Sequence, residues 1–181
     1  IKNLNEITTV AHRVVHGGEK YNSAVLIDNK VVKDIKEFCK LAPLHNPANL
    51  QGILASQKIF PKAKQIAVFD TAFYQTLEPK AFLYGIPYKK KKKHQIRKYG
   101  FHGSSHKYVT RRLIKFSKRN SKIVSCHLGN GSSITASING KTVETSMGFT
   151  PLEGLIMGTR SGTIDPAIPL QRQQILKKSA T

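Results

Sequence analysis

The chain has 181 residues, and its 30 Lys and Arg against 10 Asp and Glu give a formal net charge of +20. This length fits one domain of ordinary size, or one domain with part of a second. Apolar runs such as Ile123–Cys126 are far shorter than the ~20 residues that span a bilayer, so no membrane-spanning helix is predicted.

The first part of the chain alternates between strand and helix patterns. The predicted elements are strands over 12–16, 23–27 and 65–69 and helices over 29–41 and 47–60. Pro43 ends the first helix, while Asn46 is the predicted N-cap of the second, with Pro47 at its first helical position. The strand over 65–69 ends at Asp70, where active-site groups of α/β sheets commonly project.

The second part predicts a loop, a helix and a hairpin. Residues 75–99 contain prolines and the lysine run Lys89–Lys93, which indicate a surface loop. The later predicted elements are a helix from Ser104 or Ser105 to about Lys118, strands over 122–129, 132–138 and 141–146, and a helix from 166 to 178. Asn139-Gly140 between two alternating runs predicts a type I′ turn. The mixture of helices and strands predicts an α/β fold.

The cysteines and the start of the chain bear on the cell compartment. Cys39 and Cys126 form neither a CxxC pattern nor a metal-ligand spacing, so we expect both to be reduced and buried. Residues 1–12 lack the apolar stretch of a signal peptide, and a start at Ile1 indicates that the natural N-terminus lies elsewhere. These features predict a cytoplasmic protein.

The basic excess has two interpretations, which are binding of nucleic acid or a membrane surface, and a solvated surface on an enzyme with anionic substrates. Much of the excess lies in Lys89–Lys93 and in the basic stretch 111–119, without interleaved aromatic residues or a zinc finger. We therefore expect neither nucleic acid nor a membrane as partner. Were nucleic acid bound, neutralising Lys89–Lys93 would weaken binding and flatten its salt dependence.

Two segments carry residues suited to phosphate. In HLGNGSSITA, over 127–136, Gly129 and Gly131 let the backbone approach an anion, although an ordinary glycine turn has the same composition. No GKS or GKT follows, so Walker chemistry is not predicted. In MGTRSGTIDP, over 157–166, Arg160 can reach a transferring phosphoryl group, or it can form a surface ion pair.

Three further segments suggest an anion or carboxylate site. In YGFHGSSH, His102 stands just ahead of a predicted helix and can donate to an anion, or it can cap the helix, whereas His106 fits a structural role. In HRVVHGGE, Arg13 beside valines combines a charged fork with an apolar wall, as a small carboxylate with a methyl group requires. In LAPLHNPAN, Leu44 and His45 add an apolar and a polar group.

Together these segments, with VFDTAF and ETSMGFTPLEGLIMGTRSGTIDP, closely resemble the acetate kinase family in order and spacing, from Arg13 to Pro166. The resemblance implies an actin/ribonuclease-H-like α/β fold of the acetate and sugar kinase, Hsp70 and actin superfamily. It is incomplete here, with parts of two related domains over residues 1–120 and 121–181. It also implies reversible in-line phosphoryl transfer from ATP to acetate, giving acetyl phosphate and ADP, with Mg²⁺ offsetting charge.

The resemblance assigns roles residue by residue. Arg13 would bind the acetate carboxylate, and Asp70 would orient the reacting groups. His102 and Arg160 would stabilise the phosphoryl group in flight, with His45 beside them. The methyl pocket would be lined by Val15, Leu44, Phe101 and Pro151. The ATP phosphate loop would comprise His127, Leu128, Gly129, Asn130 and Gly131.

The chain also departs from the family pattern. The family's adenosine pocket and metal-associated glutamate lie beyond these residues, so no metal ligand is assigned here. Tyr74 stands where the family usually has His, and Thr163 where it usually has Asp. We expect a homodimer or a complementing fragment to complete the protein. The alternatives are a non-catalytic remnant or split-enzyme piece of an acetate kinase, a propionate kinase, or a basic nucleic-acid-associated protein.

Overall fold

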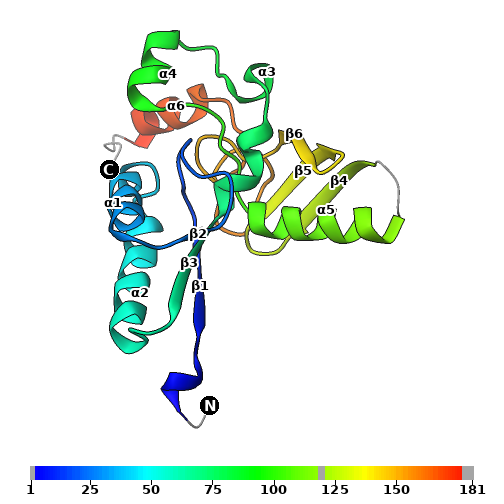
Figure 1. The fold of residues 1–181 in the computed structure, drawn as a ribbon. Coiled ribbons are helices and arrows are strands. Elements are labelled where there is room, and N and C mark those ends of the chain that lie inside the picture. Colours follow the sequence, from blue (N-terminus) through cyan, green and yellow to red (C-terminus); the bar gives the residue numbers. More distant parts are fainter. Residues whose placement is uncertain (1–2, 118–120, 177–181) are drawn as a thin grey trace.

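The computed structural model of the protein describes residues 3–117 and 121–176 and shows a mixed α/β fold with two small sheets (Figure 1). In chain order the first elements are η1 (Leu4–Glu6), β1 (Thr9–Val14), β2 (Val25–Leu26), α1 (Asn29–Glu37), η2 (Phe38–Lys40), α2 (Asn46–Ile59), β3 (Lys64–Phe69) and η3 (Asp70–Thr76). The remaining elements are α3 (Pro79–Phe82), α4 (Tyr88–His94), α5 (Gly103–Ser117), β4 (Lys122–Leu128), β5 (Ser132–Ile138), β6 (Lys141–Thr145) and α6 (Ala167–Leu176). Within the described residues, no helix is both long and apolar enough to cross a membrane.

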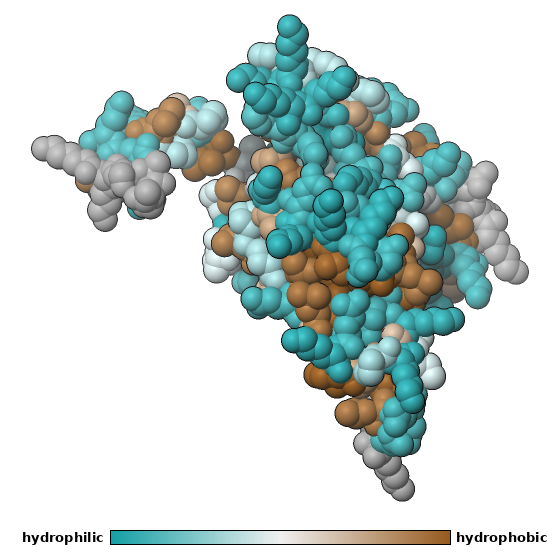
Figure 2. All heavy atoms as spheres, turned by 60° about the vertical axis from the view of Figure 1, so that its left-hand side comes forward, coloured by the Kyte–Doolittle hydropathy of each residue, from teal (hydrophilic) through white to brown (hydrophobic). Residues whose placement is uncertain are grey.

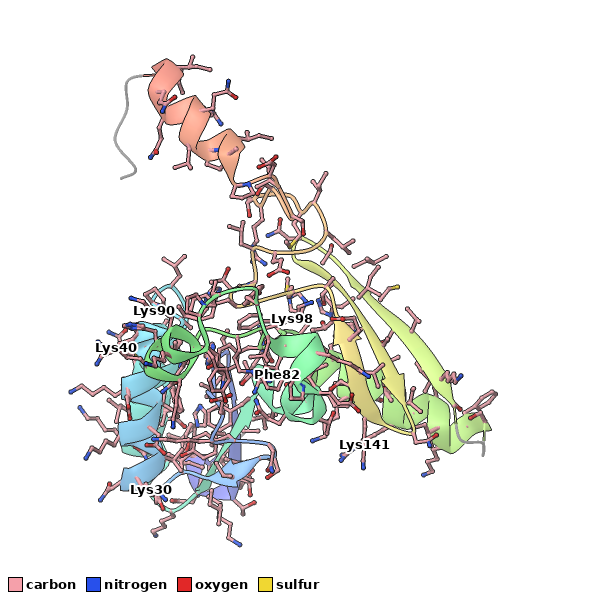
Figure 3. The ribbon with its side chains drawn as sticks, turned by 90° about the horizontal axis from the view of Figure 1, so that it is seen from above. Lys30, Lys40, Phe82, Lys90, Lys98 and Lys141 are labelled. Carbon is pink, nitrogen blue, oxygen red and sulfur yellow. The ribbon has the colours of Figure 1, made fainter. Side chains whose placement is uncertain are left out.

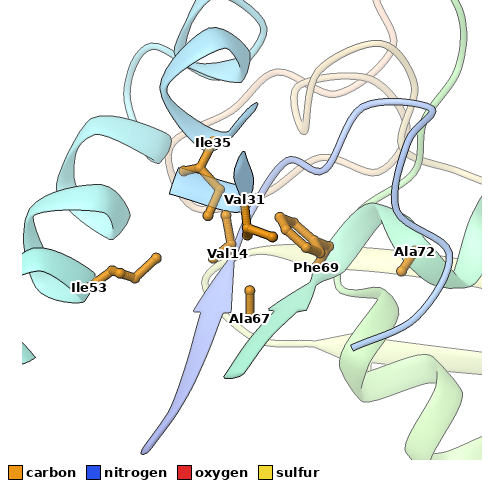
Figure 4. Close-up of a cluster of buried hydrophobic side chains, with 7 residues drawn as sticks. All are labelled: Val14, Val31, Ile35, Ile53, Ala67, Phe69 and Ala72. Atoms are coloured by element: carbon orange, nitrogen blue, oxygen red, sulfur yellow. The ribbon is translucent and has the colours of Figure 1, made fainter. Parts of the chain in front are cut away.

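The first sheet has the strand order β1-β3-β2, with β1 parallel and β2 antiparallel to β3. Its apolar side chains meet those of α1 and α2 in one buried cluster (Figure 4), which comprises Val14, Val31, Ile35, Ile53, Ala67, Phe69 and Ala72. Because β1 and β3 are parallel and pair Val14 with Phe69, their carboxyl ends lie at the same edge of the sheet. Arg13 and Asp70 therefore lie side by side at this edge.

The second sheet is an antiparallel meander, β4-β5-β6, with α5 packed against β4. Asn139 and Gly140 between β5 and β6 have φ values of 51° and 79°, which confirms the predicted type I′ hairpin turn. The face of β4 that α5 does not cover carries Val124 and Leu128, which are 70% and 73% exposed. Cys126 points to the same exposed face, because side chains two apart share one side of a strand.

Several local predictions were wrong. Cys126 is exposed and Cys39 only partly buried, although both are free thiols as expected. Asn46 begins α2 but does not cap it, since His45 occupies the cap position and the Asn46 side chain binds elsewhere. The segment 75–99 is not a plain loop: Pro79 begins α3, and the lysine run forms α4.

The helix α4 is a basic surface helix with no buried residue. Lys91 of this run contacts the body of the protein, with Nζ 3.1 Å from Oε1 of Glu19 and 5.6 Å from the centre of the Phe82 ring. Figure 3 shows Lys90 and Lys141 on opposite sides of the molecule. Lys30 and Lys40 lie on the same side as Lys90, so the labelled lysines gather there in part, while Lys141 lies apart from them.

Two features concern the outer parts of the chain. The helix α6 has no buried residue, and it stands away from the rest of the molecule (Figures 2 and 3). The helix α5 packs against β4 and η3, although the predicted boundary between residues 120 and 121 separates it from the second sheet. That division into two domains stays a prediction.

Candidate active site

The turn after β1 is held by side chains of α2 and η3. The backbone N–H of Val15 donates to Oδ1 of Asn49 (3.1 Å), and that of His16 donates to Oδ1 of Asn46 (3.0 Å). Nδ2 of Asn46 returns a bond to the His16 carbonyl (2.9 Å). These amides replace a strand partner where the sheet ends, and this fixes the position of Arg13. No sequence pattern had predicted this role of the two asparagines.

Arg13 and Asp70 form the charged centre of the site. Nη2 of Arg13 lies 2.6 Å from Oδ2 of Asp70, and Nε lies 3.1 Å from both carboxylate oxygens. The Asp70 side chain is 1% exposed and the Arg13 side chain 61%. The hydrogen bond and charge of Asp70 raise the pKa of Arg13 above its ordinary value, against a smaller opposing effect of burial. Arg13 therefore reaches from a buried carboxylate toward solvent.

The start of α5 lies directly against Asp70. Ser104 Oγ donates to Asp70 Oδ1 at 3.2 Å, and Gly103 touches the backbone of Asp70 so closely that a Cβ would overlap its carbonyl group. The preceding residue, His102, has a φ of 58°, in the left-handed region. This turn directs the His102 side chain toward the second sheet.

His102 lies in a group of rings and hydroxyls between α5 and the second sheet. Its ring stacks on that of His127, with centroids 4.1 Å apart and planes at 25°, and its Nδ1 lies 2.9 Å from Ser133 Oγ. Burial, followed by the charge of His127, lowers the pKa of His102 to about 4. Its ring is therefore neutral near pH 7.

Gly131 lies between the two predicted phosphoryl ligands. A Cβ placed on Gly131 would be 3.2 Å from Nε2 of His102 and 3.5 Å from Nη1 of Arg160. A Cβ on Gly158 would lie 2.7 Å from Oδ1 of Asn130. The hairpin β4–β5, the His102 turn and the Arg160 loop thus meet around a small space that only glycines leave open.

Arg160 and His45 approach the same space from two loops. Nη1 of Arg160 donates to the Pro151 carbonyl at 3.1 Å, which anchors the side chain. Burial, and then the charges of Arg160 and Arg13, lower the pKa of His45. The positive charges of both guanidinium groups therefore disfavour protonation of His45.

The predicted methyl-pocket residues divide into two groups. Val15 and Phe101 lie in one buried cluster together with Tyr99, Met147 and Met157. Leu44 is 86% exposed and packs into no described cluster. In the predicted ATP loop, Leu128 is likewise 73% exposed, with Gly129 and Asn130 exposed beside it. The structure thus brings Arg13, Asp70, His102, His127, Gly131 and Arg160 together, but it leaves Leu44 apart.

Comparison with known proteins assigns the chain to a family. A model of the acetokinase family matches residues 1–180. The chain belongs to the acetokinase family. It is 62% identical over 171 residues to the acetate kinase of Desulfitobacterium hafniense, a match that covers 93% of this chain and 43% of that protein.

Two solved structures share the fold. A propionate kinase from Francisella tularensis matches with a TM-score of 0.95 at 50% identity, over 99% of this chain and 47% of its own. The acetate kinase of Porphyromonas gingivalis matches with a TM-score of 0.93 at 45% identity, over 99% and 46%. These matches confirm the expected acetate kinase fold. The chain spans less than half the length of the relatives it matches.

The two residues that were expected to depart from the family pattern, Tyr74 and Thr163, both form hydrogen bonds within the acetokinase chain. Tyr74 is fully buried, and its hydroxyl donates to the Phe101 carbonyl (2.6 Å) and lies 3.1 Å from Thr135 Oγ1. Thr163 Oγ1 accepts from the Gly154 backbone N–H at 3.0 Å, and this closes the loop that carries Arg160. Both residues thus support backbone next to the predicted site.

Replacing Tyr74 by phenylalanine is expected to lower the free energy of unfolding of the acetokinase chain by about 1–2 kcal/mol, because the buried Phe101 carbonyl loses its hydroxyl donor. Urea denaturation followed by circular dichroism measures the change. Tyr108→Phe, at a residue 64% exposed, is the control and should shift stability by less than ~0.5 kcal/mol. Equal effects of the two substitutions would contradict a role for the buried bond.

A metal ion held at the predicted site would need a group of ligating side chains. Within residues 3–117 and 121–176, no group of three His, Cys, Asp or Glu side chains is placed to hold a metal ion. Asp70 is the site carboxylate, and Arg13 already pairs with it. A cavity of about 470 Å³ beside α6 contains none of the predicted site residues; its lining comprises Ser161, Ile164, Ile168, Pro169, Arg172, Gln173 and Leu176. The predicted site is thus an open, cationic surface.

Proposed function

We propose that the chain carries out phosphoryl transfer between ATP and acetate, in both directions, as an acetate kinase. The observation that supports this most directly is the position of Gly131, close to both His102 Nε2 and Arg160 Nη1. A ring N–H and a guanidinium around a backbone with no side chain suit the charge that develops on a transferring phosphoryl group.

The carboxylate end of the substrate would meet Arg13. Nε and Nη2 of Arg13 bind Asp70, which leaves the Nη1 amino group to donate to a second carboxylate. Asp70, held by Arg13 and Ser104, would fix the orientation of that fork. Val15 and Phe101 would present apolar surface to the methyl group, with Pro151 beside Arg160 and Leu44 at the open side.

The phosphates would lie along the β4–β5 turn. Gly129, Asn130 and Gly131 would offer backbone N–H groups and an amide, while His127 and Leu128 lead into the turn, and His45 would add a neutral donor or acceptor. Membership of the family implies ATP and a divalent metal in general. A bound Mg²⁺ would offset phosphate charge, with ligands outside this chain. Catalysis by these residues would rest on positioning and on preorganised positive charge.

Propionate is the second candidate substrate, because one solved relative, at 50% identity, is named a propionate kinase. One methylene in an apolar pocket changes the binding free energy by only ~1–3 kcal/mol. Both acids are therefore expected to be phosphorylated, at different rates. We propose acetate as the better substrate, and a homodimer or a complementing fragment as the assembly that completes the site. The exposed Val124 and Leu128 of β4 support the second part, since partners commonly cover such side chains.

A hydroxamate assay of acyl phosphate formation tests the proposal, with ATP, Mg²⁺ and either acid. The chain is expected to form acetyl phosphate faster than propionyl phosphate, and Arg160→Ala is expected to lower the rate by about 10³-fold. Arg112→Ala, at an exposed position of α5, is the matched control and should keep full activity. No product from a folded sample, as monomer or dimer, would instead support a non-catalytic remnant of an acetate kinase.

A further inference from the structure

A buried serine links the site histidine to a second histidine outside the site. Ser133 Oγ, on β5, lies 2.9 Å from Nδ1 of His102 and 2.8 Å from Nε2 of His106. Ser133 is 0% exposed and His106 is 1% exposed. The hydroxyl therefore bridges two imidazole rings away from water.

The connection continues to a second serine. Nδ1 of His106 lies 2.7 Å from Ser125 Oγ on β4. Ser125 Oγ also lies 3.4 Å from the Thr135 carbonyl oxygen, outside the usual range of about 2.5–3.0 Å for O–H···O bonds. Three short contacts thus run in order from Ser125 through His106 and Ser133 to His102.

The direction of these bonds follows from counting protons. Burial lowers the pKa of His102 and of His106 to about 4, so each ring carries one proton near pH 7, and each serine also has one to give. If His102 donated to Ser133 through Nδ1, Ser133 would have to donate to His106 Nε2, and His106 Nδ1–H would have to donate to Ser125. The buried Ser125 proton would then be left with the 3.4 Å contact. If both rings donated to Ser133, its own proton would lack an acceptor among the described residues.

One arrangement gives both serine protons and the His106 ring proton a short bond. Ser125 donates to His106 Nδ1, His106 Nε2–H donates to Ser133, and Ser133 donates to His102 Nδ1. The remaining proton of His102 is then on Nε2, the atom 3.2 Å from the Cβ position of Gly131. The stacked ring of His127, itself 3.0 Å from Ser105 Oγ through Nδ1, holds the plane of the His102 ring.

We propose that Ser125, His106 and Ser133 form a directional hydrogen-bond chain that keeps the proton of His102 on Nε2, facing the anion site. Phosphoryl oxygens only accept hydrogen bonds, so the other tautomer would direct a lone pair at them. Ser133 and His106 are therefore positioning residues, and they act through His102. This role in transfer rests on the proposed kinase function, whereas the proton arrangement itself does not.

Long-range ¹H–¹⁵N NMR of the chain labelled at its histidine rings tests the arrangement directly. His102 and His106 are both expected to show a protonated Nε2 and an unprotonated Nδ1 at pH 7, with assignments made from His102→Gln and His106→Gln. An unprotonated Nε2 on either ring overturns the proposal. This measurement needs neither turnover nor a stable Ser133 variant, so it decides the proposal even if the kinase function fails.

Kinetics of the active protein test the positioning role. Ser133→Ala is expected to lower kcat by about 10-fold or more while the KM for acetate stays within about twofold, because the carboxylate site at Arg13 is unaffected. Ser133→Thr, which keeps the hydroxyl, is expected to restore most of kcat. An unchanged kcat in folded Ser133→Ala, or a parallel loss in Ser133→Thr with intact folding, contradicts the role.

Discussion

Replacing Gly103 by alanine is expected to lower the free energy of unfolding by about 3 kcal/mol or more, which is beyond the range of most single substitutions. The added methyl carbon would overlap the Asp70 carbonyl oxygen and lie 3.0 Å from the carbonyl carbon and 3.2 Å from Cβ of Phe73. Because the obstacle is backbone, no side chain can rotate out of the way. Either α5 or η3 must move, and this separates Ser104 from Asp70.

Gly52→Ala provides the matched control, since Gly52 lies on the exposed face of α2 and a Cβ there meets nothing within 4 Å. It should stabilise the chain by about 0.5–1 kcal/mol, because alanine forms helix more readily than glycine. Urea denaturation of both variants measures the contrast. Similar stability of Gly103→Ala and the unsubstituted chain would show that α5 does not depend on this close approach.

The close approach of Gly103 illustrates what the sequence reveals and what it hides. The helix from about 104 and the strand ending at Asp70 both follow from local patterns, and both exist as α5 and β3. The helix begins against the Asp70 backbone, and this contact joins chain segments that are far apart in sequence. No pattern within residues 103–117 predicts it. A glycine after His102 fits many local turns equally well.

The candidate site was predictable to a similar extent. Arg13 and Asp70 were brought into one site by the resemblance, and they form a bidentate pair. The predicted strand over 12–16 put Arg13 at its start, whereas β1 ends directly after it, at Val14. The hairpin turn at Asn139-Gly140 could also be predicted, because it depends only on neighbouring residues. Leu44 was placed by resemblance alone, and in the described chain its side chain faces solvent. The serines at 125 and 133 lie on predicted strands, but only the packing of α5 onto β4 and β5 turns them toward His106.

Burial of histidines in a chain with so few acids has a consequence for stability. The pKa values of His16, His102 and His106 are each lowered to about 4, chiefly by burial. His16 accepts the Gly18 N–H through Nδ1 at 3.1 Å, and its Nε2 has no hydrogen-bond partner within the described residues. Its ring packs edge-on against Tyr99, with centroids 4.4 Å apart, so a second proton would place a charge among aromatic rings.

The free energy of unfolding is therefore expected to fall as the pH drops from about 6.5 to about 4. In that window the unfolded chain, with ordinary histidine pKa values near 6.5, binds protons that the folded chain does not, so acid favours unfolding. Each fully buried histidine contributes a slope of up to about 1.4 kcal/mol per pH unit, or about 2 kcal/mol by pH 5. His102, which is half-buried, contributes less.

Urea unfolding at a series of pH values tests this, with His16→Gln set against His94→Gln. His16→Gln should flatten the slope between pH 6.5 and 4, whatever its stability at pH 7, because it removes one buried site of protonation. His94→Gln, on the exposed end of α4, removes the same ring and should leave the slope as it is. Both variants remove one histidine ring from the unfolded chain, so a difference between their slopes reports on the folded state. Parallel slopes in the two variants would mean that His16 takes up its proton without unfolding, and that its burial does not limit stability in acid.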